Sequence, residues 1–164
     1  PLLLRAIRFW QTTCPGAPIY VSAGQPDHAL SLPDDVTPIY DQVADCGPMG
    51  GLQAAFRQCK EELLWVSAVD MPLLSSQAVE QLSDKRCHCE DACIFTHDGR
   101  PEPLLGLYRS TCLPVMDQLL SSGEPRMSAL LNAVRTTQVL LKNMDWVCNV
   151  NTPQELDQLR QEQH

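Results

Sequence analysis

The sequence contains no long apolar run, no excess of basic residues, and no repeat or low-complexity tract. Every uninterrupted apolar stretch is much shorter than the roughly 20 residues that a membrane-spanning helix needs, so we expect no membrane partner. The chain is acidic, with a net charge of −8 and a pI of about 4.8, which argues against a nucleic-acid partner. Its 13 Pro and 8 Gly are scattered without a period, which excludes collagen-like or linker-like character.

The composition that remains is that of an ordinary globular protein. The chain has 164 residues, of which 44% are hydrophobic and 20% are charged. This is enough apolar material to bury a core and to exclude global disorder. We therefore expect one domain over residues 1–164. The chain begins at Pro1, without an initiator Met and inside a predicted helix, so we expect the domain to be incomplete at its N-terminus.

Eight cysteines are irregularly spaced, and the sequence shows no secretory signal ahead of them. We therefore expect reduced thiols and a cytoplasmic location. Three of these cysteines, Cys87, Cys89 and Cys93, lie close to His88 in the sequence, and thiolates and imidazole can bind zinc. The usual C-x-x-C spacing is absent, so a loop that is merely rich in cysteine is the alternative.

Helical patterns alternate with short apolar strands along the chain, which predicts an α/β fold with a mostly parallel sheet. The predicted helices span residues 1–13, 52–60, 76–85, 111–120 and 127–134, and a last one begins at the capping box 152–155. The predicted strands span residues 19–21, 36–40, 63–69, 92–96, 104–108, 139–141 and 146–150. The strand 63–69 is almost continuously apolar, as expected for a strand that is covered on both faces.

Asp70 follows this most apolar strand, and ligands of parallel α/β sheets bind at the carboxyl ends of strands. A carboxylate in this place suits Mg²⁺, which prefers one or two carboxylates together with phosphate oxygens and water. The alternative is that Asp70 only caps the following turn.

Three further segments could contact an anionic ligand. The run 47–51, Gly-Pro-Met-Gly-Gly, precedes a predicted helix, where glycines allow close backbone approach, although a tight turn explains it equally well. Asn149 and Asn151 alternate at a predicted strand end, so both amides can face a ligand or serve the adjacent turn. Arg126 could bind a phosphate or simply be solvated. The chain contains neither a Walker loop nor a G-x-S-x-G nucleophile elbow.

These segments occur in an order that resembles the molybdenum cofactor guanylyltransferase (MobA-type) family of nucleotidyltransferases. The resemblance covers nearly the whole chain and is carried by Asp41, residues 47–52, residues 69–72, residues 97–100 with Pro103 and Leu104, Gly123 with Arg126, and residues 149–156. The segments Gly-Pro-Met-Gly-Gly and Asn-Val-Asn-Thr-Pro are its most specific parts.

The resemblance implies a Rossmann-like fold with helices on both faces of the sheet, and a reaction that joins GMP from Mg·GTP to the phosphate of molybdopterin with release of pyrophosphate. By the same resemblance, Asp70 is implied as the catalytic ligand of Mg²⁺ and of the GTP phosphates. The implied nucleotide contacts are Ser22, Asp41, Gly47 and Gly51. The residues implied for the pterin substrate or for turnover are Arg126, Asn149 and Asn151. No covalent nucleophile is needed for such a displacement.

One family signature is missing, namely Leu-Ala-Gly-Gly followed by an Arg and a Lys, which belongs to the first strand and its phosphate loop. In the family that strand lies between the equivalents of strands 19–21 and 63–69, so we expect the 164 residues to fold poorly without it. Two other functions stay open: a molybdopterin cytidylyltransferase or related nucleotidyltransferase, and a nucleotide-binding or adaptor module without catalysis.

Overall fold

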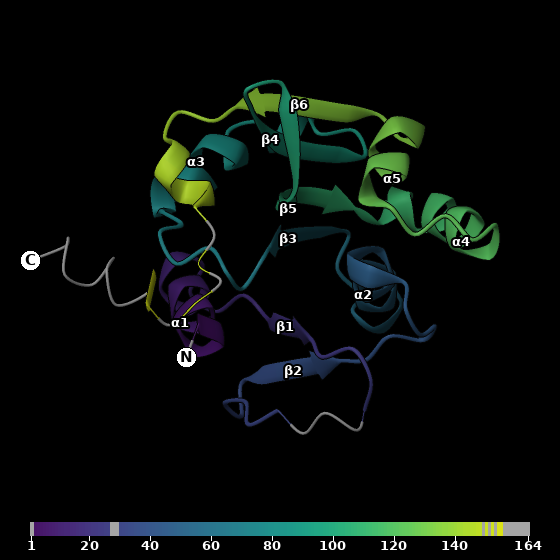
Figure 1. The fold of residues 1–164 in the computed structure, drawn as a ribbon, viewed down its shortest axis with the longest axis horizontal. Coiled ribbons are helices and arrows are strands. Elements are labelled where there is room, and N and C mark those ends of the chain that lie inside the picture. The colour runs from purple at the N-terminus through teal and green to yellow at the C-terminus, as the bar shows by residue number, and fades with distance from the viewer. Residues whose placement is uncertain (1, 27–29, 149, 151, 153, 156–164) are drawn as a thin grey trace, which may run out of the picture.

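The structure is a computed structural model that describes residues 2–26, 30–148, 150, 152, 154 and 155. Helices and strands alternate along the described chain, as predicted for an α/β protein (Figure 1). The helices are α1 (Leu2–Thr13), α2 (Gly47–Gln58), α3 (Ser76–Ser83), α4 (Leu113–Ser121) and α5 (Met127–Ala133). The strands are β1 (Ile19–Ser22), β2 (Val36–Ile39), β3 (Leu63–Ser67), β4 (Ala92–His97), β5 (Arg100–Arg109) and β6 (Thr136–Leu140).

The strands form two separate sheets. Strands β1 and β2 pair in parallel, and a four-stranded sheet has the order β3-β5-β4-β6. In the larger sheet β3, β4 and β6 run in one direction, while β5 runs against both of its neighbours. Three of the four strands therefore run in the same direction, as expected for a mostly parallel sheet. Only the β4–β6 pair of this sheet is parallel, however, because β5 lies antiparallel between β3 and β4. The cause is the tight β4–β5 hairpin, in which Asp98 and Gly99 both adopt a positive φ.

Helices cover both faces of the four-stranded sheet, as the family resemblance implied. On one face Ile94 and Tyr108 pack with apolar residues of α2, α4 and α5. On the other face Phe95 and Leu105 pack with residues of α3 and with Trp146. Strands β4 and β5 supply side chains to both clusters in alternation, and the residues at the centre of each strand are fully buried.

Strand β3 differs from its prediction as a fully covered strand, because all five of its residues are only half-buried. One edge of β3 pairs with β5, and one edge of β1 pairs with β2. Within the described residues no strand pairs with the second edge of either. The first strand of the family, whose signature is missing from this sequence, would lie between the second edge of β1 and the second edge of β3.

Helices α1 and α2 both contact the two sheets. In α1, Ile7 packs with Val21 of β1, and the Trp10 indole N–H donates to Ser67 Oγ at the end of β3 at 2.9 Å. In α2, Leu52 packs against Leu64 of β3, and the same helix contacts β1 and β2. The two sheets are therefore joined through helices rather than through strand pairing.

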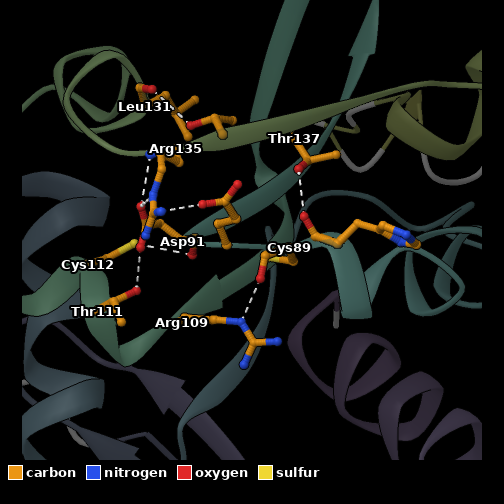
Figure 2. Close-up of polar contacts among 11 residues, drawn as sticks. Cys89, Asp91, Arg109, Thr111, Cys112, Leu131, Arg135 and Thr137 are labelled. Atoms are coloured by element: carbon orange, nitrogen blue, oxygen red, sulfur yellow. Dashed lines mark hydrogen bonds and ion pairs between the residues drawn. The ribbon is translucent and has the colours of Figure 1, made fainter.

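Asp91 links the start of β4 to the segments that precede β6 and follow β5 (Figure 2). Its carboxylate accepts from the Thr111 hydroxyl (2.7 Å), the Arg135 backbone N–H (2.9 Å) and Arg135 Nε (3.2 Å). Asp91 is only 8% exposed, and these bonds, that of Thr111 first, hold the pKa of its carboxyl below the usual value. Asp91 is therefore a structural carboxylate.

Several element predictions need correction, among them the start of β5, which lies at Arg100 rather than at residue 104. The Gly-Pro-Met-Gly-Gly segment is not a loop ahead of α2 but its first turn, because the helix begins at Gly47. The strand predicted over residues 146–150 is wrong. Residues Met144–Val147 form a 3-10 helix, which begins where Asn143 Oδ1 accepts from the Asp145 N–H (3.0 Å). Strand β6 begins at Thr136, three residues earlier than predicted.

Side chains cap the start of α3 and form the predicted capping box. Ser75 Oγ accepts from the Gln77 N–H at the start of α3 (3.2 Å). In the capping box, the Thr152 N–H donates to Glu155 Oε2 (3.0 Å), and the Glu155 N–H donates to Thr152 Oγ1 (3.2 Å). Among the described residues, no helix has the length and apolar character that crossing a membrane requires.

Candidate nucleotide site

The carboxyl ends of β1 and β2 meet the first turns of α2 at one place. Their pairing continues beyond the strands, since the Ala23 N–H donates to the Ile39 carbonyl and the Asp41 N–H donates to the Gly24 carbonyl, each at 2.8 Å. Ser22 at the end of β1 and Asp41 just after β2 thus lie side by side. Of the five predicted nucleotide contacts, which include Asp70, the three that are brought together here are Ser22, Asp41 and Gly51.

The glycines of α2 allow this close approach. A Cβ on Gly51 would collide with Ser22 Oγ and would lie 3.6 Å from Asp41 Oδ1. A Cβ on Gly50 would lie 2.8 Å from Cys46 Cβ and 3.6 Å from Asp41 Oδ2. The backbone of α2 therefore passes directly beside the Asp41 carboxylate. Our sequence reasoning quoted Gly50 within the motif but did not assign it to the site, although its place beside Gly51 was the available signal.

The Asp41 carboxylate is the unusual group of this site. Its Oδ1 is shielded from solvent and has no hydrogen-bond partner within the described part of the chain. Burial raises the pKa of this carboxyl above its usual value, because the charged form is less well solvated there. A shielded oxygen without a donor is costly in the free protein. A ligand that brings N–H or O–H donors to Asp41 would offset that cost.

Gly47 lies at the start of α2 with a φ of +55°. A side chain at this position would find open space, so the requirement for glycine comes from the backbone conformation. Asp45 also has a positive φ, of 60°. These two residues turn the chain sharply from the Asp41 segment into the helix, which leaves the first N–H groups of α2 at the same end as Ser22 and Asp41.

Asp70 lies three residues after β3 and is half-buried. Its backbone carbonyl accepts from the Val150 N–H (2.9 Å), whereas its carboxylate makes no hydrogen bond or ion pair with any other described residue. Its neighbours Val69 and Met71 line a cavity of about 140 Å³ against α1, where Arg5 also contributes. Asp70 itself does not line this cavity. A single carboxylate can hold Mg²⁺ where a nucleotide supplies the other oxygens. The described residues contain no cluster of three acidic, His or Cys side chains that would form a metal site by themselves.

Arg126 is not brought into contact with these groups. It precedes α5, which lies beside α4 at the right of Figure 1, whereas α1 lies at the left. Its guanidinium is exposed and pairs with both carboxylate oxygens of Glu124, at 2.8 Å and 2.5 Å. Hydrogen bonds from Arg126 lower the pKa of Glu124 to about 2, and Glu124 raises the pKa of Arg126. A phosphate that binds Arg126 must therefore compete with Glu124.

The remaining predicted positions divide into two groups. Asn149 and Asn151 lie outside the described residues, as does the side chain of Cys87. Cys89 and Cys93 are free thiols in the core. Burial raises the pKa of both, to about 11 for Cys93, which disfavours the thiolates that zinc requires.

Known structures define the class of this architecture. The fold matches the crystal structure of 2-C-methyl-D-erythritol 4-phosphate cytidylyltransferase from Thermus thermophilus with a TM-score of 0.73. That match covers 99% of this chain and 88% of the other, and since the two are only 13% identical it shows the fold alone. The fold is therefore the nucleotide-diphospho-sugar-transferase-like fold that the resemblance implied.

The family follows from closer comparisons. Residues 1–139 match the model of the MobA-like NTP transferase domain, and the chain belongs to this family. It is 32% identical to the probable molybdenum cofactor guanylyltransferase of Mycobacterium avium (strain 104), over 88% of this chain and 74% of that protein. It is 25% identical to the molybdopterin-guanine dinucleotide biosynthesis protein A of Archaeoglobus fulgidus, with a TM-score of 0.64 over 77% of this chain and 67% of the other.

Proposed function

We propose that the protein transfers GMP from Mg·GTP to the phosphate of molybdopterin. A phosphate oxygen of molybdopterin attacks the α-phosphorus of GTP, the bond between the α-phosphorus and the bridging oxygen breaks, and pyrophosphate leaves. Family membership and the names of the relatives from Mycobacterium avium and Archaeoglobus fulgidus support this assignment. The reaction needs positioning and charge neutralisation rather than a covalent nucleophile.

The observation that carries the proposal is the shielded Asp41 Oδ1, which has no partner among the described residues and lies beside Ser22 and Gly51. Guanine has two adjacent donors, N1–H and the N2 amino group, which match the two acceptor oxygens of an ionised carboxylate. Cytosine has one amino donor next to an acceptor nitrogen, so one carboxylate oxygen would face a lone pair. An ionised Asp41 therefore favours guanine over cytosine. Ser22 is exposed at the same place and can contact the nucleoside with its hydroxyl.

Asp70 is the residue that would hold the metal ion, through a carboxylate that no other described residue occupies. A Mg²⁺ ion bound there would neutralise charge on the phosphate oxygens of GTP. The role of Asp70 itself is to provide a fixed negative charge at the carboxyl end of β3.

We assign the pterin side of the reaction to Arg126, Asn149 and Asn151, as the family resemblance implies. The exposed guanidinium of Arg126 can exchange its bond with Glu124 for a bond with the incoming phosphate. This exchange would offset part of the repulsion between two anionic substrates. The Arg126→Ala variant should accordingly weaken binding of molybdopterin more than binding of GTP.

Pyrophosphate release by the natural full-length protein tests the proposal. With molybdopterin and Mg²⁺ present, GTP should support release and CTP should not, and omission of molybdopterin should abolish it. A preference for CTP would show that the protein is a cytidylyltransferase. Binding of GTP without release of pyrophosphate would indicate a nucleotide-binding module without catalysis.

A further inference from the structure

Arg57, in the last turn of α2, connects the segment that carries Asp41 with helix α4. Its Nη1 donates to Gln42 Oε1 at 2.5 Å, and its Nη2 donates to Asp117 Oδ1 at 2.7 Å. Gln42 directly follows Asp41, and Asp117 belongs to α4. Because the guanidinium group is planar and rigid, these two bonds fix the two segments relative to each other. Our sequence reasoning did not single out Arg57.

The α4 end of this connection is anchored by a buried side chain. Gln53 is only 4% exposed, and its Nε2 donates to the same oxygen, Asp117 Oδ1, at 2.6 Å. Gln53 and Arg57 are four residues apart and therefore lie on one face of α2. Asp117 is thus held in place by a buried amide, and Arg57 extends from this fixed point toward the exposed Gln42.

The segment 40–42 is held from three sides, while the Asp41 Oδ1 is left without a partner among the described residues. Besides the bond from Arg57 to Gln42, the Asp41 N–H donates to Gly24 and Gln58 Nε2 donates to the Tyr40 carbonyl at 3.4 Å. None of these bonds engages the shielded oxygen of Asp41. The contacts therefore restrain the backbone of Tyr40 and Asp41 and the side chain of Gln42, and they leave the Asp41 Oδ1 for a ligand.

We propose that Arg57 is a positioning residue of the nucleotide site, which acts through Gln42 on the orientation of Asp41. This inference rests on the proposed function, in which Asp41 binds the base of GTP. The Arg57–Asp117 pair is 39% and 40% exposed, and an exposed ion pair adds little to stability. Its main effect is to orient the residues that it joins.

The proposal predicts a particular pattern of kinetic change. The base contacts the site equally in the ground state and in the transition state, so its misplacement raises KM for GTP and leaves kcat unchanged. For Arg57→Met we expect KM for GTP to rise about 3- to 10-fold, the effect of one hydrogen bond, with KM for molybdopterin unchanged. Arg57→Lys should give an intermediate value, since an ammonium group cannot bridge both partners in the same geometry.

A double-mutant cycle on the dissociation constant of GTP tests the inference in the natural full-length protein. The variants are Arg57→Met, Gln42→Leu and the two combined, and Arg100→Met, at the exposed first residue of β5, is the matched control. If Arg57 acts through Gln42, the combined variant binds GTP no more weakly than Arg57→Met alone, and the control binds normally. Additive losses, or GTP affinity unchanged in Arg57→Met, would overturn the inference.

Hydrogen exchange provides a second readout that is independent of catalysis. In Arg57→Met the Asp41 amide, which the Gly24 carbonyl protects, should exchange faster, while amides of the β4–β5 ladder keep their rates. Faster exchange in both places would mean general destabilisation and would overturn the inference. A wild-type protein that binds no GTP would overturn both this inference and the proposed function. Normal wild-type GTP affinity with independent effects of Arg57 and Gln42 would overturn this inference alone.

Discussion

Asp41 places a charged group where the described part of the free protein has no donor for one of its oxygens. Its raised pKa means that the folded state disfavours the ionised form. Stability from this group is therefore fully present below the unfolded-state pKa and is lost as pH rises through the higher folded-state pKa. At neutral pH the carboxylate works against folding, which is typical of a group retained for binding.

The Asp41→Asn variant separates these two effects. Without the charge, the free protein should be at least as stable as the wild type at pH 7. Its affinity for GTP should fall about 10- to 100-fold, because an amide can accept only one of the two guanine hydrogen bonds. Thermal unfolding and calorimetric titration measure the two quantities. An unstable variant, or one with normal GTP affinity, would show that Asp41 is structural.

Asp70 is the residue that we expect to affect turnover, because it would hold the metal ion. Asp70→Asn keeps the shape of the side chain and removes its charge, so it should lower kcat at least about 100-fold while the melting temperature stays unchanged. Asp98→Asn, in the exposed β4–β5 turn, is the matched control and should leave the rate unaltered. A nearly normal rate for Asp70→Asn at saturating Mg²⁺ would reject the role in metal binding.

Asp91 is the opposite case, a carboxylate whose pKa is lowered by its bonds to Thr111 and Arg135. Its stabilising effect is present above the unfolded-state pKa and is lost as pH falls through the lower folded-state pKa. Asp91→Ala should cost about 1–3 kcal/mol at pH 7, because it removes the hydrogen bonds that a buried carboxylate accepts from Thr111 and Arg135, and less in acid. Urea unfolding at several pH values measures this. Glu90→Ala removes only the exposed contact with Arg135 and should change little. Equal losses in the two variants would contradict this account.

Helix α2 is the element on which the nucleotide site depends, because its first turns pack against Ser22 and Asp41 without side chains between them. Gly51→Ala should favour the helix by its propensity but force α2 away from β1, with a net loss of about 1–3 kcal/mol. The double variant Ser22→Gly/Gly51→Ala restores the space.

Unfolding and GTP binding should therefore respond differently in these two variants. The double variant should recover most of the stability but not the GTP affinity, since it lacks the Ser22 hydroxyl. Full stability in Gly51→Ala alone would mean that the close approach of α2 is not required.

Elements with strong local patterns could be predicted from the sequence. The apolar residues Leu3, Leu4, Ile7 and Trp10 define one face of α1, and Thr152 with Glu155 forms the expected cap. The strand predicted at 146–150 failed because Asn143 begins a local turn that the apolar pattern of Trp146 and Val147 does not reveal. Pairing direction depends on contacts between distant strands, so the position of β5 between β3 and β4 could not be read from either strand alone.

The candidate site was predictable in part. Motif order identified Ser22, Asp41 and Gly51, and the structure brings them together. The unpaired oxygen of Asp41 and the reach of Arg57 to Gln42 arise from tertiary packing and leave no local pattern. For Arg126, the sequence motif implies a contact with the substrate, whereas the structure shows a hydrogen bond to Glu124.

At the scale of the whole molecule, the two sheets present open edges of β1 and β3 that no described strand pairs. We expect a further strand from outside these 164 residues to pair with both edges in the natural protein. Each backbone group that such a strand satisfies in the interior is worth about 1–3 kcal/mol, so several matter against a domain stability of about 5–15 kcal/mol.

Urea unfolding of the 164-residue chain beside the natural full-length protein checks this expectation. The 164-residue chain should unfold at lower urea with a broader transition, and its β1 and β3 amides should exchange quickly. A cooperative 164-residue chain with the stability and exchange protection of the natural protein would contradict it.

The central claim is that this fold transfers the GMP unit of GTP to molybdopterin. Its most direct test follows the label when the natural full-length protein is incubated with Mg²⁺, molybdopterin and GTP labelled either at the α- or at the γ-phosphate. The account predicts that the α-label appears on the pterin product and that the γ-label leaves as pyrophosphate. Label transferred from the γ-phosphate, or transfer from CTP in preference to GTP, would contradict it.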